Sequence, residues 1–252
     1  MKQRYNQDVV NMYRLGTSGW YYDEWAGTFY PEDVDKREWL SYYTDHFDTV
    51  EVNASFYRLP FENMIKGWDN RTDDDFLFVF KGSRVVTHVK RLKDVKDQLD
   101  RFYDRISLIK HKTGAVLWQL PPGIRRDDDL LIGFIEDLNK EYRNVIEFRD
   151  ESWFREDIFD LLRDHDVSYC IVDCPDIPSV MEVTSDMAYI RFHGKENWYS
   201  YDYSGQELGG WASKIKQLHA KDVFCFFNND QGGYAPKNCE ALKEMLTDIG
   251  SR

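Results

Sequence analysis

Charged and amide side chains stand at the C-terminal ends of nearly all the segments that have the composition of β-strands. Carboxylates, amines and imidazoles carry out general acid–base catalysis, and guanidinium and ammonium groups bind anionic substrates. The strand-end residues of these types are Glu51, Asn53, Lys81, Gln119, Glu147, Arg149, Asp173, Arg191, His193, Asn228 and Asn229. Their types and their shared position predict a polar pocket that holds a small anion.

Alternation along each segment predicts which way these side chains point. In residues 48–53, Val50 and Val52 suit a surface covered by helices, so Glu51 and Asn53 face the opposite side. The same alternation turns a further set of strand-end residues inward, namely Lys81, Gln119, Glu147, Arg149, Asp173, Arg191 and His193. Buried charges are costly unless they are paired, so the alternative interpretation is a self-satisfied lattice of ion pairs in a polar core.

The elements that must position these residues alternate between strand and helix. Eight apolar segments rich in β-branched or aromatic residues lie at 14–20, 48–53, 76–82, 114–120, 143–149, 167–173, 187–193 and 222–228. Apolar residues at helical spacing separate most of these segments, most regularly at 92–109. Residues 174–186 are few and include Pro175 and Pro178, so no full helix is expected there.

This alternation predicts an α/β fold, a (β/α)8 TIM barrel in a single domain covering residues 1–252. Residues 1–13 would form an N-terminal extension and the barrel would occupy residues 14–250, with the helix between strands six and seven reduced or missing. The rival fold, an open doubly wound sheet, usually has a glycine-rich phosphate loop after its first strand. This chain has the bulky sequence GTSGWYYDEW there, which favours the barrel.

Active sites of such barrels form at the C-terminal ends of the strands, so we assign roles to the residues expected there. Catalytic roles are assigned to Glu51, Lys81, Glu147, Asp173 and His193. His193 is the best general acid or base, and a hydrogen-bonded core histidine is the alternative. Substrate contacts are assigned to Trp20, Asn53, His88, Gln119, Arg149, Trp153, Arg191, Tyr201, Asn228 and Asn229.

The loops around the predicted mouth support a ligand that carries both an anion and a ring. Lys81, Arg84 and His88 follow the third strand and suit a phosphate or a carboxylate, whereas Lys90 and Arg91 suit a solvated helix face. Aromatic platforms suit sugar rings or nucleobases, and the residues expected to serve this purpose are Trp20, Trp153, Trp198 and Tyr201.

No cofactor and no metal is required by these residue types. A single divalent ion held by Glu51, Glu147, Asp173 or Asp230 is an alternative, because hard cations prefer carboxylate oxygens. Lys81, Arg149 and Arg191 could neutralise the same carboxylates without any metal.

Composition narrows the range of partners and the location. The chain has 33 basic and 45 acidic residues and a net charge of −12, so duplex nucleic acid and anionic membranes are poor partners. No apolar run approaches the ~18 residues of a membrane span, and the polar N-terminus lacks the apolar core of a signal peptide. The four cysteines form no CxxC pair, which favours reduced, buried thiols in a cytoplasmic protein.

Short motifs follow one another at the strand ends, between Gly16 and Ala241, in the order GTSGW, FYP, VEVN, SFYRLP, QLPP, EFR, RFHG and FNND. As a set they resemble the YecE-like family, which is also called domain-of-unknown-function family 72. The resemblance implies a TIM-barrel-like fold and carries no settled biochemical activity. A likeness to barrels of the xylose-isomerase and endonuclease-IV type is one of fold alone.

Three functions are compatible with this sequence. The first is an enzyme, a hydrolase, lyase or isomerase, that acts on a small or single-stranded anionic substrate such as a phosphorylated sugar or a nucleotide. The second is a non-catalytic protein that binds a metabolite in the same pocket. The third is a nucleic-acid repair factor similar to endonuclease IV, which the net charge of −12 and the scarcity of histidines disfavour.

Overall fold

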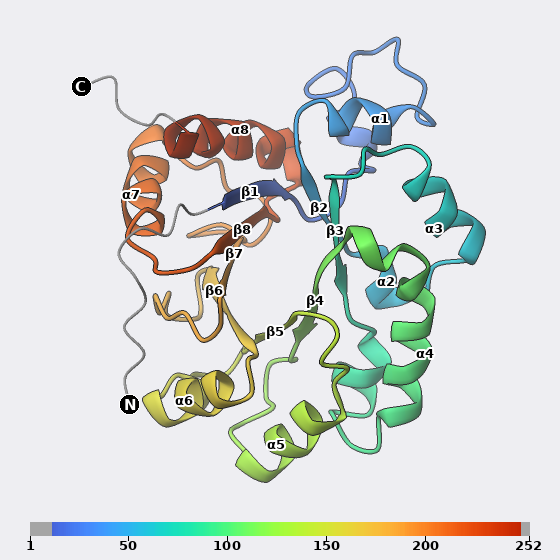
Figure 1. Ribbon diagram of the computed structural model, residues 1–252. Helices are drawn as coiled ribbons and strands as arrows, with labels where there is room; N and C mark the ends of the chain where they lie inside the picture. The colour runs from blue at the N-terminus through green and yellow to red at the C-terminus, as the bar shows by residue number, and fades with distance from the viewer. Residues whose placement is uncertain (1–11, 248–252) are drawn as a thin grey trace.

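The computed structural model describes residues 12–247 and shows eight parallel strands curved into a nearly closed barrel (Figure 1). The strands are β1 (Met12–Thr17), β2 (Thr49–Val52), β3 (Leu77–Lys81), β4 (Thr113–Gln119), β5 (Asn144–Glu147), β6 (Ser168–Asp173), β7 (Met187–Phe192) and β8 (Asp222–Phe227). Hydrogen-bonded neighbours follow the order β1-β8-β7-β6-β5-β4-β3-β2. The predicted single-domain barrel with eight strands is therefore confirmed.

Helices cover the outside of the barrel, as Figure 1 shows. They are α1 (Trp39–Thr44), α2 (Ala54–Tyr57), α3 (Glu62–Asp69), α4 (Lys96–Ile106), α5 (Asp128–Asp137), α6 (Glu156–Asp164), α7 (Gly205–Ile215) and α8 (Tyr234–Thr247). A π-helical turn, η2 (Val85–Val89), follows β3, and the 3-10 turns are η1 (Asp23–Trp25), η3 (Ser107–Lys112), η4 (Glu151–Trp153) and η5 (Gln231–Gly233). Local sequence explains where α7 begins, because the Ser204 hydroxyl and the Glu207 carboxylate accept each other's backbone N–H groups in a capping box.

Apolar side chains form two layers because successive residues of a strand face opposite sides. The outer layer, to which Ile146 and Ile190 belong, packs between the strands and the surrounding helices. The inner layer, to which Val79 and Phe226 belong, fills the barrel. Inward positions are apolar in the middle of the barrel and turn polar towards the strand ends, as from Val79 to Lys81 at the C-terminal end of β3. The alternation that packs the core therefore also presents polar groups at the mouth.

The barrel closes at a seam between β1 and β2, which share an isolated bridge instead of a ladder. Gly16 allows the two backbones to approach, because a Cβ at this position would lie 2.0 Å from the carbonyl oxygen of Thr49. The Tyr43 hydroxyl accepts a hydrogen bond from the Thr17 N–H at 2.8 Å and donates one to the Thr49 oxygen at 3.1 Å. This single side chain from α1 thus connects the two strands.

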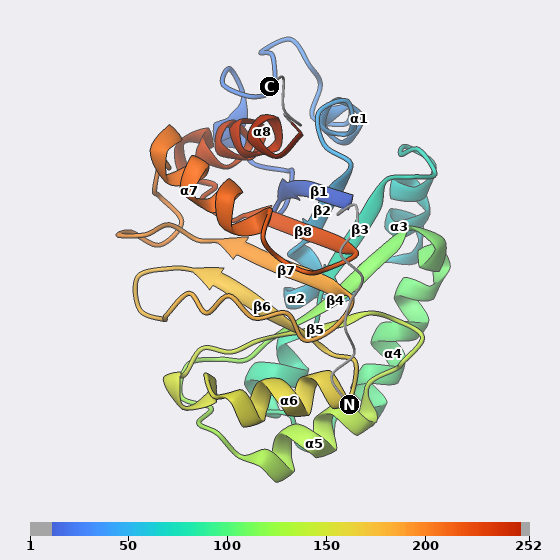
Figure 2. The same cartoon turned by 60° about the vertical axis from the view of Figure 1, so that its left-hand side comes forward.

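Residues 174–186 contain no helix, as predicted, and Figure 2 shows them as an irregular loop between β6 and β7. Val180 and Met181 pack against the outer apolar layer and cover part of the space that a helix would occupy. The Thr184 hydroxyl accepts a hydrogen bond from the Tyr169 N–H at 2.7 Å, which holds the loop against β6.

The predicted N-terminal extension, residues 1–13, overlaps β1, which begins at Met12. The remainder of that extension and predicted barrel residues 248–250 lie outside the described residues. Between residues 12 and 247, no helix is both long and apolar enough to cross a membrane. The four cysteines are buried free thiols, namely Cys170, Cys174, Cys225 and Cys239.

Candidate functional site

Arg191 on β7 lies fully buried at the centre of the polar groups in the C-terminal mouth of the barrel. Its Nη2 donates to Glu51 Oε1 at 2.5 Å and to Asn228 Oδ1 at 2.8 Å, and its Nη1 donates to Glu147 Oε2 at 2.7 Å. One guanidinium therefore links β2, β5 and the end of β8. We use the name mouth cluster for Glu51, Lys81, Glu147, Arg149, Arg191 and His193, which the structure brings together as predicted.

Glu51 is fully buried and has a complete set of hydrogen-bond donors. Besides Arg191, the Tyr189 hydroxyl donates to its Oε2 at 2.7 Å and the Ser18 hydroxyl donates to its Oε1 at 2.8 Å. Sequence analysis did not assign Tyr189 or Ser18 to the site. Tyr189 was detectable, because it lies two residues before Arg191 and therefore faces the same side of β7.

Glu147 is also fully buried and pairs with both Arg149 and Arg191. Burial alone would raise the pKa of Glu147, but the two guanidiniums lower it below its usual range. The carboxylate is therefore ionised at neutral pH, and it serves to hold two cations in place.

His193 lies in the mouth as predicted, but it does not act as a cation there. Its Nε2 lies 3.0 Å from Arg149 Nη2 and 3.3 Å from Arg191 Nη1, both of which are donors, so Nε2 accepts and the imidazole is neutral. Burial and these two guanidiniums lower the pKa of His193 well below its usual range. The Trp198 ring covers this part of the site, 4.7 Å from the Arg149 guanidinium and 5.3 Å from the imidazole ring.

Lys81 differs from the other cations of the mouth cluster because its ammonium has no hydrogen bond or ion pair with the described residues. Its Nζ lies 4.5 Å from the centre of the Phe56 ring. Burial, followed by repulsion from Arg191, lowers the pKa of Lys81 to about 8. His88 packs edge to face against the same Phe56 ring, with 5.0 Å between the ring centres, and burial and the charge of Lys81 lower the pKa of His88.

Asp230, which follows β8, is a second group that titrates near neutral pH. Burial raises the pKa of Asp230 to about 7, although Asn228 Nδ2 donates to its Oδ1 at 2.9 Å. Asn228 in turn accepts from Arg191, so Asp230 is connected to the mouth cluster through one amide. From the sequence, Asp230 is expected only as an alternative metal ligand.

Asp173 does not face the mouth, so that part of the sequence prediction is wrong. Cys170, Val172 and Cys174 belong to the layer inside the barrel, which places Asp173 on the helix-facing side of the chain. There its Oδ1 lies 3.5 Å from the Ser179 hydroxyl. The inward series of β6 remains apolar to its end, and a polar residue at the end of a strand is no proof of inward direction.

Three predicted substrate contacts also lie outside the mouth cluster. Trp153 is fully buried in the outer apolar layer, and its Nε1 donates to the Ile124 oxygen at 2.7 Å. Asn229 is fully buried and donates to the Tyr201 oxygen at 2.7 Å. The Tyr201 hydroxyl donates to Glu207 on α7 at 2.7 Å, a hydrogen bond that raises the pKa of Tyr201 to about 12. Aromatic residues in loops either pack against the core or stack on ligands. The residue types are the same in both roles, so the sequence does not distinguish them.

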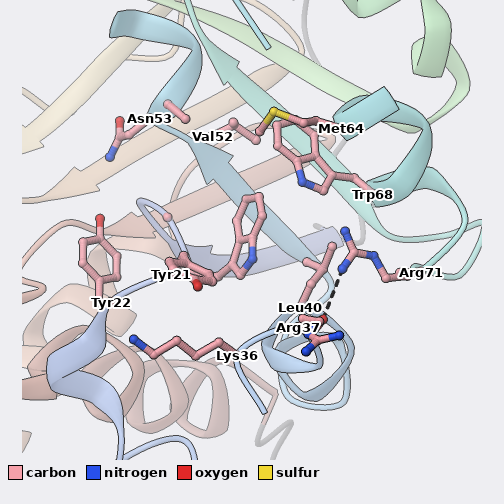
Figure 3. A pocket seen from close by; sticks show the side chains of 13 residues that line it. Tyr21, Tyr22, Lys36, Arg37, Leu40, Val52, Asn53, Met64, Trp68 and Arg71 are labelled. Atoms are coloured by element: carbon pink, nitrogen blue, oxygen red, sulfur yellow. Dashed lines mark hydrogen bonds between the residues drawn. The ribbon is translucent and has the colours of Figure 1, made fainter. Parts of the chain in front are cut away.

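The other predicted contacts lie near the mouth cluster. Gln119 ends β4 and is the ladder partner of Glu147 on β5. Asn53 Nδ2 donates to the Ser18 carbonyl oxygen at 3.1 Å. Trp20 lines a separate cavity of about 470 Å³ beside the mouth, which Figure 3 shows from close by.

The carboxylates proposed as alternative metal ligands do not converge on one point. Glu51 and Glu147 both face Arg191, and Asp173 lies on the other side of its strand. Within residues 12–247, no three His, Cys, Asp or Glu side chains are grouped so that they could hold a metal ion. With a neutral imidazole, the three cations and two carboxylates of the mouth cluster leave one net positive charge, which suits an anion.

A nearly closed ring of eight parallel strands with helices outside and a charged cluster at the C-terminal strand ends defines an α/β-barrel protein of the TIM-barrel class. Residues 14–251 match the sequence profile of the family described as "Protein of unknown function DUF72", and the chain belongs to this family. The YecE-like resemblance of the sequence motifs is thereby confirmed.

Relatives of the chain cover most of its length. It is 27% identical over 270 residues to UPF0759 protein YunF of Bacillus subtilis (strain 168), covering 93% of this chain and 95% of YunF. It is 24% identical over 243 residues to UPF0759 protein YecE of Escherichia coli (strain K12), covering 84% of this chain and 88% of YecE. A crystal structure of a DUF72 family protein from Thermotoga maritima MSB8 matches with a TM-score of 0.86 at 32% identity, covering 94% of this chain and 99% of that chain. These likenesses agree with the barrel described above.

Proposed function

We propose that the protein is an enzyme that binds a small anionic substrate, such as a phosphorylated sugar or a nucleotide, at the mouth cluster and acts on it by acid–base chemistry. The observation that carries this proposal is the ammonium of Lys81, which has no ion pair within residues 12–247. Arg149 and Arg191 are held by carboxylates, so Lys81 is the cation that can pair with a substrate. A partly buried lysine without a direct ion pair is costly, and a bound anion reduces that cost.

The loop that follows Lys81 supports the same location. It opens with the π-helical turn η2 (Val85–Val89), and it continues with three non-glycine residues at positive φ. These residues are Arg91 at 51°, Leu92 at 68° and Asp94 at 52°. Such conformations cost energy and concentrate at binding and catalytic sites, which supports a binding role for this loop.

Two groups of the site can both donate and accept protons near neutral pH. With a pKa of about 8, roughly one Lys81 side chain in ten is neutral at pH 7, and Asp230 with a pKa of about 7 is half ionised. General acid–base catalysis is most effective when the pKa of the catalytic group lies near the working pH. Lys81 and Asp230 are therefore stronger candidates for proton transfer than the neutral imidazole of His193.

Isothermal titration calorimetry tests whether the site binds an anion. Inorganic phosphate, ribose 5-phosphate and AMP are titrated into the wild type, into Lys81→Met and into the control Lys110→Met. Lys110 lies on η3, half-exposed and 2.7 Å from Glu141. We expect at least one of these three ligands to bind the wild type. Lys81→Met should weaken this binding at least tenfold, and Lys110→Met should leave it unchanged. Absence of binding, or equal binding to all three proteins, overturns the anion site.

A non-catalytic metabolite-binding function is the second candidate, favoured by the complete burial of Glu51, Glu147, Arg191 and His193. The charges of Glu51, Glu147 and Arg191 are paired with one another, as in a rigid framework, although Arg191 Nε and His193 Nδ1 have no hydrogen-bond partner among the described residues. Phosphorus and proton NMR separate the two functions, because they show whether a bound phosphorylated compound is converted to a product. Turnover that Lys81→Met abolishes supports the enzyme, whereas Lys81-dependent binding without conversion supports the binding protein.

The proposal includes a reducing compartment, the cytoplasm, as the place of action. It is supported by four buried thiols that are free in the fold. A single-stranded nucleic acid could pair with the Lys81 ammonium in the same way as a small phosphorylated compound, because both present phosphate groups.

A further inference from the structure

A cavity of about 470 Å³ lies beside the mouth cluster, between the loop after β1, helix α1 and helix α3 (Figure 3). We propose that this cavity binds a small planar aromatic acid, meaning an aromatic ring that carries a carboxylate or a phosphate. None of the six residues of the mouth cluster lines it, so the inference goes beyond the proposed function. Its volume lies within the range of about 300–1,000 Å³ that is usual for small-molecule sites.

The walls of the cavity are largely apolar and aromatic. Trp20 and Trp68 meet edge to face with 5.5 Å between their ring centres, and Leu40 lies among the residues that line the same space. At the rim, Tyr21 is 58% exposed and Met64 is 41% exposed, which is unusual for large apolar side chains. A flat ring inserted here would cover these surfaces and contact several aromatic faces.

The charged residues that line the cavity are all basic, although the whole chain has a net charge of −12. They are Lys36, Arg37 and Arg71. Lys36 is already neutralised by Asp23 at 2.6 Å, whereas Arg71 has no carboxylate partner among the described residues. The charge left over at this cavity is therefore positive, and it selects an acidic ligand over a neutral one.

The guanidinium of Arg71 is held in position by two backbone carbonyls. Its Nε donates to the Gly67 oxygen at 2.8 Å within α3, and its Nη1 donates to the Arg37 oxygen at 3.1 Å, the contact that is dashed in Figure 3. Neither contact uses Nη2. A guanidinium that is oriented before binding loses little freedom when an anion arrives, so Arg71 is suited to carry the acid group.

The wall between the cavity and the mouth cluster is thin. Tyr22 and Asn53 line the cavity, and both donate to the Ser18 carbonyl oxygen, at 2.5 Å and 3.1 Å respectively. The Ser18 hydroxyl donates to Glu51 in the mouth cluster. A ligand in the cavity would therefore lie next to the proposed active site without touching it, and its binding is testable separately.

Matched ligands test the proposal by isothermal titration calorimetry. 2-Naphthoate carries a carboxylate, 2-naphthyl phosphate carries a phosphate, and 2-naphthamide presents the same ring without a charge. We expect 2-naphthoate or 2-naphthyl phosphate to bind at least tenfold more tightly than 2-naphthamide, which is a difference of about 1.4 kcal/mol. The acid that binds identifies the carboxylate or the phosphate as the preferred group.

Four variants locate the binding. Arg71→Met should remove the preference for the acid. Tyr21→Ala should weaken the binding of every naphthalene compound, because it removes part of the contact with the ring. Arg101→Met, at an exposed position of α4, is the charge-matched control, and Lys81→Met separates this cavity from the mouth cluster. Both controls should bind 2-naphthoate like the wild type. Equal affinity for the acid and the amide, or binding that is insensitive to Arg71→Met and Tyr21→Ala, overturns the inference, as does loss of binding in Lys81→Met.

Discussion

Replacing Glu147 by glutamine tests whether the mouth cluster is a dry, mutually dependent set of charges. The side chain keeps its size, but the buried guanidiniums of Arg149 and Arg191 lose one of their counter-charges. Removing one partner of a buried ion pair costs about 3–5 kcal/mol of unfolding free energy. A domain of this size loses about 2–4 °C of Tm for each kcal/mol, so the expected decrease in Tm is about 6–20 °C.

The pH dependence of this effect follows from the lowered pKa of Glu147 in the folded protein. A carboxylate with a lowered pKa stabilises the fold fully above its pKa in the unfolded chain, about 4.3 for glutamate, and loses this contribution as the pH falls towards the folded value. The stability difference between the wild type and Glu147→Gln should therefore persist as the pH falls to about 5 and shrink below about pH 4.

Urea denaturation followed by tryptophan fluorescence measures the difference by linear extrapolation. The control is Glu156→Gln on α6, because this carboxylate is 69% exposed and lies 2.8 Å from Arg163. A surface pair of this kind is worth less than about 1 kcal/mol. Equal losses in the two variants would refute the reasoning, since they would mean that water screens the mouth cluster as it screens the surface.

Three further predictions concern the seam of the barrel and the thiols. Tyr43→Phe should lower the unfolding free energy by about 1–3 kcal/mol in urea, because the buried Thr17 N–H loses its acceptor; an unchanged midpoint would contradict this. Gly16→Ala should reduce the thermal midpoint, because its Cβ would lie 2.0 Å from the Thr49 oxygen, and a midpoint equal to that of the wild type would show that the seam can open without cost. Ellman's reagent should label no cysteine quickly in the folded protein and all four in urea, since all four are buried and burial raises the pKa of Cys225; rapid labelling of the native protein would disprove this.

The direction of a side chain on its own strand was readable from the sequence wherever one face of the strand is clearly apolar. Val50 and Val52 showed that Glu51 points inward, and the same reasoning placed Arg191 correctly. It failed at Asp173 because both alternating series of β6 are apolar up to its end, with Cys170 and Val172 on the inner face and Tyr169 and Ile171 on the outer face, so the alternation has no phase. The positions of the strands along the chain were predictable as well, because residue composition and a two-residue period are local properties of the sequence.

Distances between groups on different strands were decided only by the tertiary structure. In the sequence, Arg149 and Lys81 are both cations at the ends of inward-facing series. In the structure, Arg149 is held by Glu147, whereas Lys81 has no ion-pair partner in the described part of the chain. The cavity that contains Tyr21 and Arg71 is likewise assembled from segments far apart in the chain. The sequence period determines the face of a strand on which a residue lies, whereas the stagger and closure of the barrel determine which residues of other strands it meets.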